Sequence, residues 1–212
     1  MTTPAPPTPE TTAESRRRVV SVALERFLAA GFSSVTMDDL ARELGMSKKT
    51  LYEMFPSKLE LLREASEFKS ERWREEMAAI ARDSRDFFER AGRTFQFVAE
   101  LYSRLSHAYL TDLRRSAPSV WADMQEFRRK CVRRNILDLL EQGVRERVVR
   151  SDIDPDRLAE MYLTMTSGLL NPEVSGLTTG AQIGASYEAF VRVYRDGLLT
   201  IEGRRAAARR ER

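Results

Sequence analysis

The amino-acid sequence predicts an all-α protein. Apolar residues recur at spacings of three and four along almost the whole chain, which is the period of one face of an α-helix. Residue types that cap helices stand where these segments begin, and glycine or proline follows several of them. No segment shows the sustained alternation of a β-strand. We therefore expect about nine helices, arranged as an N-terminal three-helix helix-turn-helix domain followed by a larger helical bundle.

The first three predicted helices lie close together in the sequence. They cover about residues 11–30, 37–44 and 48–55. Gly31 and Gly45 follow the first two helices at positions where the backbone can turn left-handed and end a helix. Thr36, with Asp39 three residues later, has the spacing of a capping box, and Ser47 is an N-cap for the third helix.

The later helices are predicted to be longer. Ser57 and Glu60 have the spacing of a full capping box for a helix that ends near Ala81. Apolar stripes predict further helices over 86–113, 118–144 and 155–170. A glycine-rich loop over 175–184 then leads to a last helix that ends near Leu198.

The domain boundaries follow from composition. Residues 1–13 are rich in proline and threonine without apolar periodicity, which predicts a disordered arm. Residues 14–60 form the helix-turn-helix domain and 61–203 the larger helical domain. Residues 204–212 are rich in arginine and are predicted to be a frayed or disordered basic tail.

Composition excludes several classes of protein. No apolar run approaches the length of a membrane-spanning helix, and the N-terminus lacks the pattern of a signal peptide. A single cysteine, Cys131, and a single histidine, His107, argue against an internal disulfide and against a zinc site. We find no nucleophile elbow and no phosphate-binding glycine loop. We therefore expect a cytoplasmic protein that is not an enzyme, binds no metal or cofactor and does not contact membranes.

Residues 37–55 have the form of a helix-turn-helix. In this motif the first helix crosses the phosphate backbone and the second enters the major groove of double-stranded DNA, N-terminal residues first. Ser47, Lys48, Lys49 and Thr50 supply a polar and basic leading face for the second helix. Leu51 repeats the apolar spacing on its rear face, where it can pack on the helix before.

The run GFSSVTMDDLARELGMSKKTLYEMFPSKLELL, Gly31–Leu62, resembles the DNA-binding segment of the TetR (tetracycline-repressor-like) family of bacterial transcription regulators. The similarity begins at Val19, while the C-terminal part resembles the family only in length and helicity. The resemblance implies a homodimer that binds a palindromic operator and that a small apolar effector releases. It also implies a C-terminal domain for ligand binding and dimerisation.

The resemblance assigns DNA contacts to positions that match the family motif. These positions are Thr36, Ser47, Lys48, Lys49, Thr50, Tyr52 and Lys58. Among them Thr36, Tyr52 and Lys58 match phosphate contacts. The sequence departs from the pattern at Lys49, where a small residue is common, and at Glu53 and Met54, where a histidine or an aromatic residue often makes contact. Simple surface packing of Tyr52 and a solvated Lys48–Lys49 pair are the alternatives.

Aromatic residues of the larger domain are candidates for an effector pocket. The set is Phe95, Tyr102, His107, Tyr109, Trp121 and Phe127. Apolar pockets with a few polar groups are typical of small-molecule sites. Ordinary core packing is the alternative for each of these aromatic residues, and His107 is equally compatible with a position on the surface.

The last two long helices are candidates for the dimer interface, because the resemblance implies that they pair with their copies as a four-helix bundle. Their apolar stripes contain Leu158, Met161, Tyr162, Met165, Leu169, Tyr187, Phe190, Val191, Tyr194 and Leu198. Burial inside the monomer is the alternative.

The leading functional hypothesis is a ligand-released repressor. A transcriptional activator of the same fold satisfies the same motif. A helical ligand-binding protein whose helix-turn-helix does not bind DNA is the rival from another class, and specific DNA binding separates the two.

Overall fold

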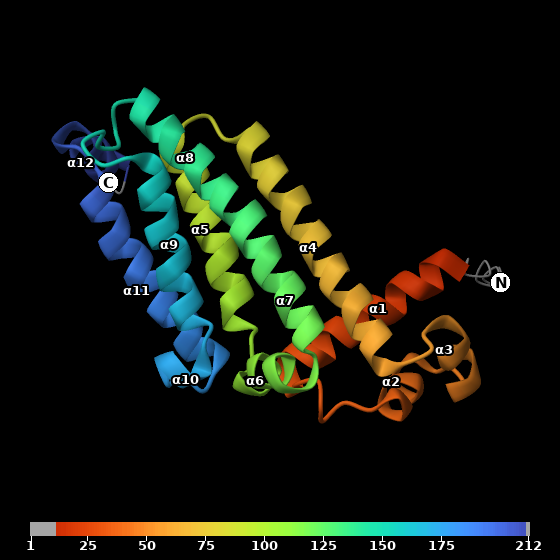
Figure 1. Ribbon diagram of the computed structural model, residues 1–212. Coiled ribbons are helices and arrows are strands. Elements are labelled where there is room, and N and C mark those ends of the chain that lie inside the picture. Colours follow the sequence, from red (N-terminus) through yellow and green to blue (C-terminus); the bar gives the residue numbers. More distant parts are fainter. Residues whose placement is uncertain (1–11, 211–212) are drawn as a thin grey trace, which may run out of the picture.

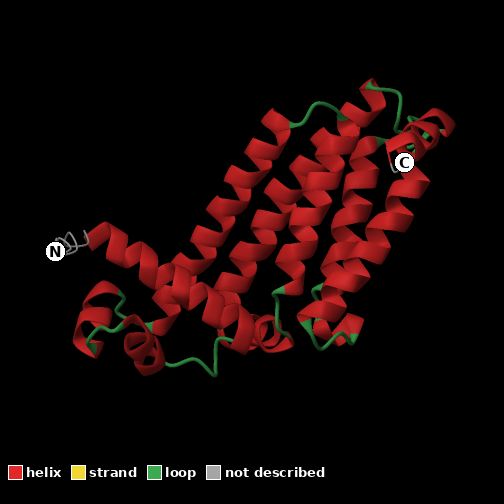
Figure 2. Ribbon diagram, turned by 180° about the vertical axis from the view of Figure 1, so that it is seen from behind, coloured by secondary structure: helices red, strands yellow, loops and turns green. Residues whose placement is uncertain are grey.

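The computed structural model describes residues 12–210, and over that range the chain forms twelve α-helices, one π-helical turn and no strand. Figure 1 shows a bundle of long helices with a small group of short helices at one end. The prediction of an all-α protein is confirmed, and 82% of the structure is helical. Figure 2 shows the same arrangement from behind, with loops only at the ends of the helices.

The N-terminal domain matches the prediction closely. Its helices are α1 (Thr12–Ala30), α2 (Met37–Leu44) and α3 (Lys48–Met54). Thr36 and Asp39 form both halves of the predicted capping box, and Ser47 Oγ accepts a hydrogen bond from the Thr50 backbone at 3.0 Å. Gly45 ends α2 in the left-handed conformation, with φ of 66°. Local chemistry therefore sets these helix ends.

The larger domain is a bundle of long helices. Its elements are α4 (Lys58–Asp83), α5 (Phe87–Ser103), α6 (His107–Ser116), α7 (Pro118–Phe127), the π-helical turn η1 (Arg128–Val132), α8 (Arg133–Arg145), α9 (Pro155–Leu169), α10 (Pro172–Ser175), α11 (Gly180–Leu198) and α12 (Ile201–Arg210). Helix α5 packs against α11 and α8 packs against α9, while α4 packs against α1, α5 and α7 (Figure 1). Helix α4 therefore belongs to both parts of the molecule.

The prediction of one helix over 86–113 was wrong. The chain breaks after α5, and Ser106 caps a separate helix, α6, by accepting a hydrogen bond from the Tyr109 backbone at 3.0 Å. The Ser106 backbone donates to the Leu28 carbonyl of α1 at 3.0 Å. The break lets α6 turn and cross the end of α1, so a contact between distant parts of the chain decides it.

The C-terminal predictions also need correction. The last long helix begins at Gly180, inside the predicted loop over 175–184, because Thr179 and Gln182 form a capping box. Residues 204–210, predicted as a frayed or disordered tail, form most of α12. Arg210 binds the Asp86 carboxylate at 2.7 and 2.8 Å, which lowers the pKa of Asp86 to about 2. A tertiary ion pair therefore anchors the basic segment.

Three smaller predictions have mixed outcomes. The capping box at Ser57 is half made, because the Glu60 side chain pairs with Arg63 instead of the Ser57 backbone. The helix predicted over 118–144 is continuous in direction but contains the π-helical turn. The predicted arm over 1–13 lies outside the described residues except for Thr12 and Ala13, which belong to α1.

One junction joins the two parts of the molecule, where α1 ends against α6. Gly31 has φ of 89°, and a Cβ added there would lie 2.8 Å from the Ala108 Cβ of α6. The Ser33 backbone donates to the Asp112 carboxylate of the same helix at 2.7 Å. Lys58, at the start of α4, donates to the carbonyls of Phe32 and Val35 at 2.9 and 3.0 Å. The loop before α2 is therefore held by α4 and α6 together.

In the part of the chain that the structure describes, no helix is both long and apolar enough to cross a membrane. The same residues contain no group of three metal-binding side chains placed to hold an ion.

We predict that Gly31→Ala destabilises the protein more than Gly45→Ala. Both glycines have positive φ, so alanine strains either backbone by about 1–2 kcal/mol. At Gly31 the added Cβ also meets Ala108 and Asp112, whereas at Gly45 it meets nothing within 4 Å. Overpacking of this kind adds about 1–3 kcal/mol. Urea unfolding of the two variants measures the difference, and equal losses would show that the junction can give way.

Candidate nucleic-acid interface and effector cavity

Helix α3 presents a polar surface at the tip of the molecule. Leu51 faces the core, while Ser47, Lys48, Lys49 and Thr50 are all exposed. Figure 1 shows α2 and α3 at the end of the molecule remote from α11 and α12. The structure therefore brings the four predicted residues of the leading face together on one exposed helical turn. It also leaves the aromatic Tyr52 side chain 47% exposed, so this residue is not part of the core.

The acidic residues of this segment all have basic partners. Lys48 pairs with Asp38, and the ammonium of Lys49 lies 3.9 Å from the Glu53 carboxylate. The other two pairs are Arg42–Asp39 and Arg26–Glu43. Exposed pairs such as these contribute at most about 1 kcal/mol each, so a phosphate can replace a carboxylate at little cost. The side chain of Lys49, 86% exposed, is the freest of these cations.

The hydroxyl groups of Thr36 and Ser47 are already used in helix caps. Thr36 Oγ1 donates to the Asp39 carboxylate at 2.6 Å and accepts from the Asp39 backbone at 3.1 Å. These bonds to Thr36 lower the pKa of Asp39. Ser47 Oγ lies 2.8 Å from Thr50 Oγ1. Both caps hold exposed backbone ends in fixed positions, which is a precondition for precise contacts with a ligand.

Lys58 lies in a different environment from the other predicted contact residues. Its ammonium is half-buried over the Phe32 ring, 4.4 Å from the centroid, and donates to two backbone carbonyls of the α1–α2 loop. Burial lowers the pKa of this ammonium. The structure therefore gives Lys58 a role in holding the loop that carries Thr36.

Arg16 is a positioning residue that the sequence left ambiguous within the Arg16–Arg18 run. Its guanidinium donates to Glu64 of α4 at 2.8 Å and to the Met54 carbonyl, the end of α3, at 2.7 Å. It also lies over the Phe55 ring, 4.3 Å from the centroid. Arg16 thus ties α1, α3 and α4 together. The available signal was its spacing of three and four residues before Val19 and Val20, which puts it on the buried face of α1.

A small cavity with a restricted opening, named the closed cavity, lies within the larger domain, between α4, α5, α6 and the α7–η1 helix. Its volume is about 60 Å³, and Tyr102, Tyr109 and Phe127 are among the residues that line it. Two other predicted pocket residues are placed elsewhere. His107 Nδ1 lies 3.3 Å from the Leu177 carbonyl, and the Trp121 ring lies near Arg114. The structure therefore gathers three of the six predicted pocket residues in this cavity.

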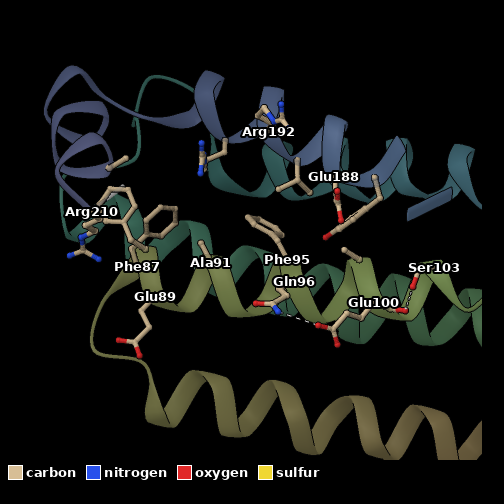
Figure 3. A pocket seen from close by; sticks show the side chains of 17 residues that line it. Phe87, Glu89, Ala91, Phe95, Gln96, Glu100, Ser103, Glu188, Arg192 and Arg210 are labelled. Carbon is tan, nitrogen blue, oxygen red and sulfur yellow. Dashed lines mark hydrogen bonds between the residues drawn. The ribbon is translucent and has the colours of Figure 1, made fainter. Parts of the chain in front are cut away.

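A second hollow is an open groove of about 740 Å³ between α5 and the helices α11 and α12. Phe95, the remaining predicted pocket residue, points across this groove from α5, as Figure 3 shows. Charges of both signs surround the apolar floor, including Glu188 and Arg192 of α11. The mixed rim favours no ligand charge, and the groove is separate from the closed cavity.

The predicted interface residues divide between core and surface. Leu158, Tyr162, Tyr187 and Leu198 are buried inside the monomer. The Tyr162 and Tyr187 hydroxyls are 2.7 Å apart, and burial raises the pKa of both. Phe190, Val191 and Tyr194 pack partly against the core, as does Leu169.

Met161 and Met165 remain on the surface of α9, each 52% exposed. Val193, on the neighbouring helix α11, is 75% exposed and lies outside the predicted stripe. On the same helix Ala185 and Ala189 are also exposed, at spacings of four residues. The exposed apolar surface of α9 and α11 thus contains two large residues of the predicted stripe and several residues outside it.

Comparison with known proteins identifies the N-terminal domain. Residues 19–65 match the sequence profile of the bacterial regulatory proteins of the tetR family. A relative is the HTH-type transcriptional regulator SrpR of Pseudomonas putida, which is 43% identical over 49 residues, covering 23% of this chain and 23% of SrpR. The chain thus matches less than a quarter of the length of that relative.

Longer similarities are weaker in sequence. The HTH-type transcriptional regulator YvaF of Bacillus subtilis is 27% identical over 162 residues, which cover 74% of this chain and 82% of YvaF. The crystal structure of a transcriptional regulator from Cytophaga hutchinsonii superposes with a TM-score of 0.71 at 15% identity and covers 87% of this chain and 98% of that one. This structural likeness shows that the two proteins share a fold over both the N-terminal and the larger domain of this chain.

We predict that Arg16→Gln lowers the free energy of unfolding by about 1 kcal/mol relative to Arg17→Gln. The first change removes the partly exposed contacts with Glu64 and the Met54 carbonyl, whereas Arg17 is exposed on the same turn. Urea unfolding monitored by circular dichroism measures both variants. Equal stabilities would show that Arg16 does not hold α3 in place.

Proposed function

We propose that this chain, a TetR-family transcriptional regulator that binds DNA, is a homodimeric repressor of a palindromic operator and is released by a small-molecule effector. The observation that carries the proposal is the exposed N-terminal turn of α3, placed at the tip of the molecule by caps and by a buried Leu51. A cytoplasmic location is the natural one for such a protein.

We propose that α3 enters the major groove with Ser47, Lys48, Lys49 and Thr50 nearest the bases. Lysine ammonium and small hydroxyl groups reach the acceptors on base edges, and the start of a helix favours nearby phosphate. Thr36 and Tyr52 would contact phosphate on either side. Lys58 would act by fixing the loop before α2, since its ammonium already binds two carbonyls of that loop.

We propose that dimerisation uses the outer surfaces of α9 and α11. Met161, Met165 and Val193 supply exposed apolar contacts, and the small residues Ala185 and Ala189 allow two helices to approach closely. Two copies related by a two-fold axis would present their α3 helices to half-sites roughly 34–36 Å apart. A palindromic operator is the DNA counterpart of that symmetry.

We propose that effector binding changes the distance between the two α3 helices through α4 and α6. Helix α4 lines the closed cavity with Lys69 and Trp73, and its first residue, Lys58, holds the loop before α2. Helix α6 lines the same cavity with Tyr109 and contacts that loop with Asp112. A ligand that favours another position of either helix shifts the population toward a form with lower DNA affinity.

Selection of bound sequences from random double-stranded DNA tests the proposal. We expect a palindrome whose half-sites have the spacing of about one helical turn of DNA.

With that DNA, Lys49→Ala should reduce the slope of log affinity against log salt concentration by about one if Lys49 contacts phosphate. If Lys49 contacts a base, the substitution should change the preferred site. Recovery of no preferred sequence at physiological salt would favour the helical ligand-binding protein. A reporter gene placed behind the selected site then separates repression from activation.

We predict that Val193→Asp converts the dimer to a monomer. An unpaired carboxylate buried in an interface costs several kcal/mol, and the two copies would repel each other. Val174→Asp is the matched control, because Val174 is exposed to a similar extent, 70%, but lies on α10. Light scattering after gel filtration measures the mass of each variant. An unchanged dimer in Val193→Asp would place the interface elsewhere.

A further inference from the structure

We infer that the closed cavity takes the carboxylate of a small amphipathic acid, with Arg128 as its counter-ion. The inference deepens the proposed function by naming the chemical class of the effector, and it rests on that function only for the consequence of binding. The binding itself follows from the residues around the cavity.

Arg128 is a buried cation without a carboxylate partner. It is 7% exposed, and among residues 12–210 no carboxylate oxygen lies within ion-pair distance of its guanidinium. Its Nη atoms donate to the hydroxyls of Tyr102 at 2.8 Å and Thr166 at 2.9 Å, with Ser167 at 3.4 Å. Hydroxyl dipoles offset part of the desolvation cost of a buried charge, but a neighbouring anion offsets much more.

The guanidinium also has an unused donor. Within the part of the chain that the structure describes, Arg128 Nε is buried and has no hydrogen-bond partner, although Arg128 lines the cavity. The Tyr109 hydroxyl, from the opposite helix α6, is likewise buried without a partner and belongs to the lining. Buried polar groups are nearly always satisfied in native proteins, so two orphans in the wall of one cavity indicate a site that a polar ligand completes.

The other residues that line the cavity indicate the charge and the shape of that ligand. No aspartate or glutamate lines the cavity, whereas Lys69 adds a second cation, with its ammonium 5.4 Å from the centroid of the Tyr109 ring. The rest of the wall is mostly apolar, and Trp73 meets Phe127 edge to face at 5.3 Å. Two cations and two orphaned polar groups in an apolar wall fit a monoanionic head on an apolar body.

The size of the cavity favours a small acid. A volume of about 60 Å³ has room for about four to six groups the size of a water molecule. A straight-chain acid of three or four carbons, which has five or six non-hydrogen atoms, matches that room, and longer acids would require the helices to move. The polar wall comes partly from η1, a π-helical turn, and such turns recur at functional sites in helices.

The test measures direct binding to the full-length protein by calorimetry, with straight-chain acids from propanoate to octanoate and the primary amide of each. We expect each fitting acid to bind at least about tenfold more tightly than its amide, because hydrogen bonds to a charged group are stronger than those to a neutral one. Arg128→Gln should abolish this preference. Arg129, the next residue in the sequence, is exposed and pairs with Glu126, so Arg129→Gln should retain the preference for acids.

Tyr109→Phe keeps the inference testable if Arg128→Gln does not fold. The Tyr109 hydroxyl has no partner, so its removal should leave the melting temperature unchanged or higher while it weakens acid binding about tenfold. Acids that bind no better than amides, or acid binding that is the same in Tyr109→Phe, would overturn the inference. DNA binding measured in parallel separates the two claims. Intact binding to a selected palindrome without any preference for acids would reject the carboxylate and leave the regulator standing.

Discussion

The close approach of α1 and α6 at Gly31 is the constraint on which the rest of the structure depends. Gly31 has a left-handed backbone and no side chain. The end of α1 can therefore lie in contact with Ala108 of α6. The loop that follows is then held from two sides, by Asp112 of α6 and by Lys58 of α4. Because this loop leads directly into the capping box of α2, the orientation of α2 and α3 is set by two helices that also line the closed cavity. A rigid joint of this kind can transmit a small displacement, whereas a flexible linker would absorb it.

The basic residues near the tip serve two different purposes. Arg16 and Lys58 direct their charge inward and bind backbone carbonyls at the ends or connections of helices, so they determine where α3 lies. Lys48 and Lys49 direct their charge outward and contact only exposed carboxylates that a phosphate can replace. The net charge of +3 does not distinguish the inward-facing cations from the outward-facing ones. The acidic residues of α2 and α3 each pair with a base, so their charges cancel in the total. Position, and not the total charge, separates a structural cation from one available to DNA.

The two hollows of the larger domain differ in chemistry as well as in size. The open groove between α5 and α11 is larger, but its rim carries acids and bases together, so it has little power to select a charged ligand (Figure 3). The closed cavity is small and has only basic ionisable groups besides tyrosine in its wall. Desolvation strengthens electrostatic interactions within the closed cavity, whereas water weakens them in the groove. The smaller hollow is therefore the one in which a single arginine can decide what binds.

Helices whose ends are capped by neighbouring residues could be predicted from the amino-acid sequence alone. Thr36, Gly45 and Ser47 form their caps with atoms a few residues away, and the helix-turn-helix motif is built from such local signals, so it was predicted nearly to the residue. The tertiary structure accounts for the break before α6, the folding of α12 on Asp86 and the burial of Tyr162 and Tyr187, for which an interface and the monomer core had both been open. It alone also decided that Arg128 faces a cavity without a carboxylate. The spacing of apolar residues along a helix predicts which face is buried. The residues that pack against that face come from distant parts of the chain, so local spacing cannot identify them.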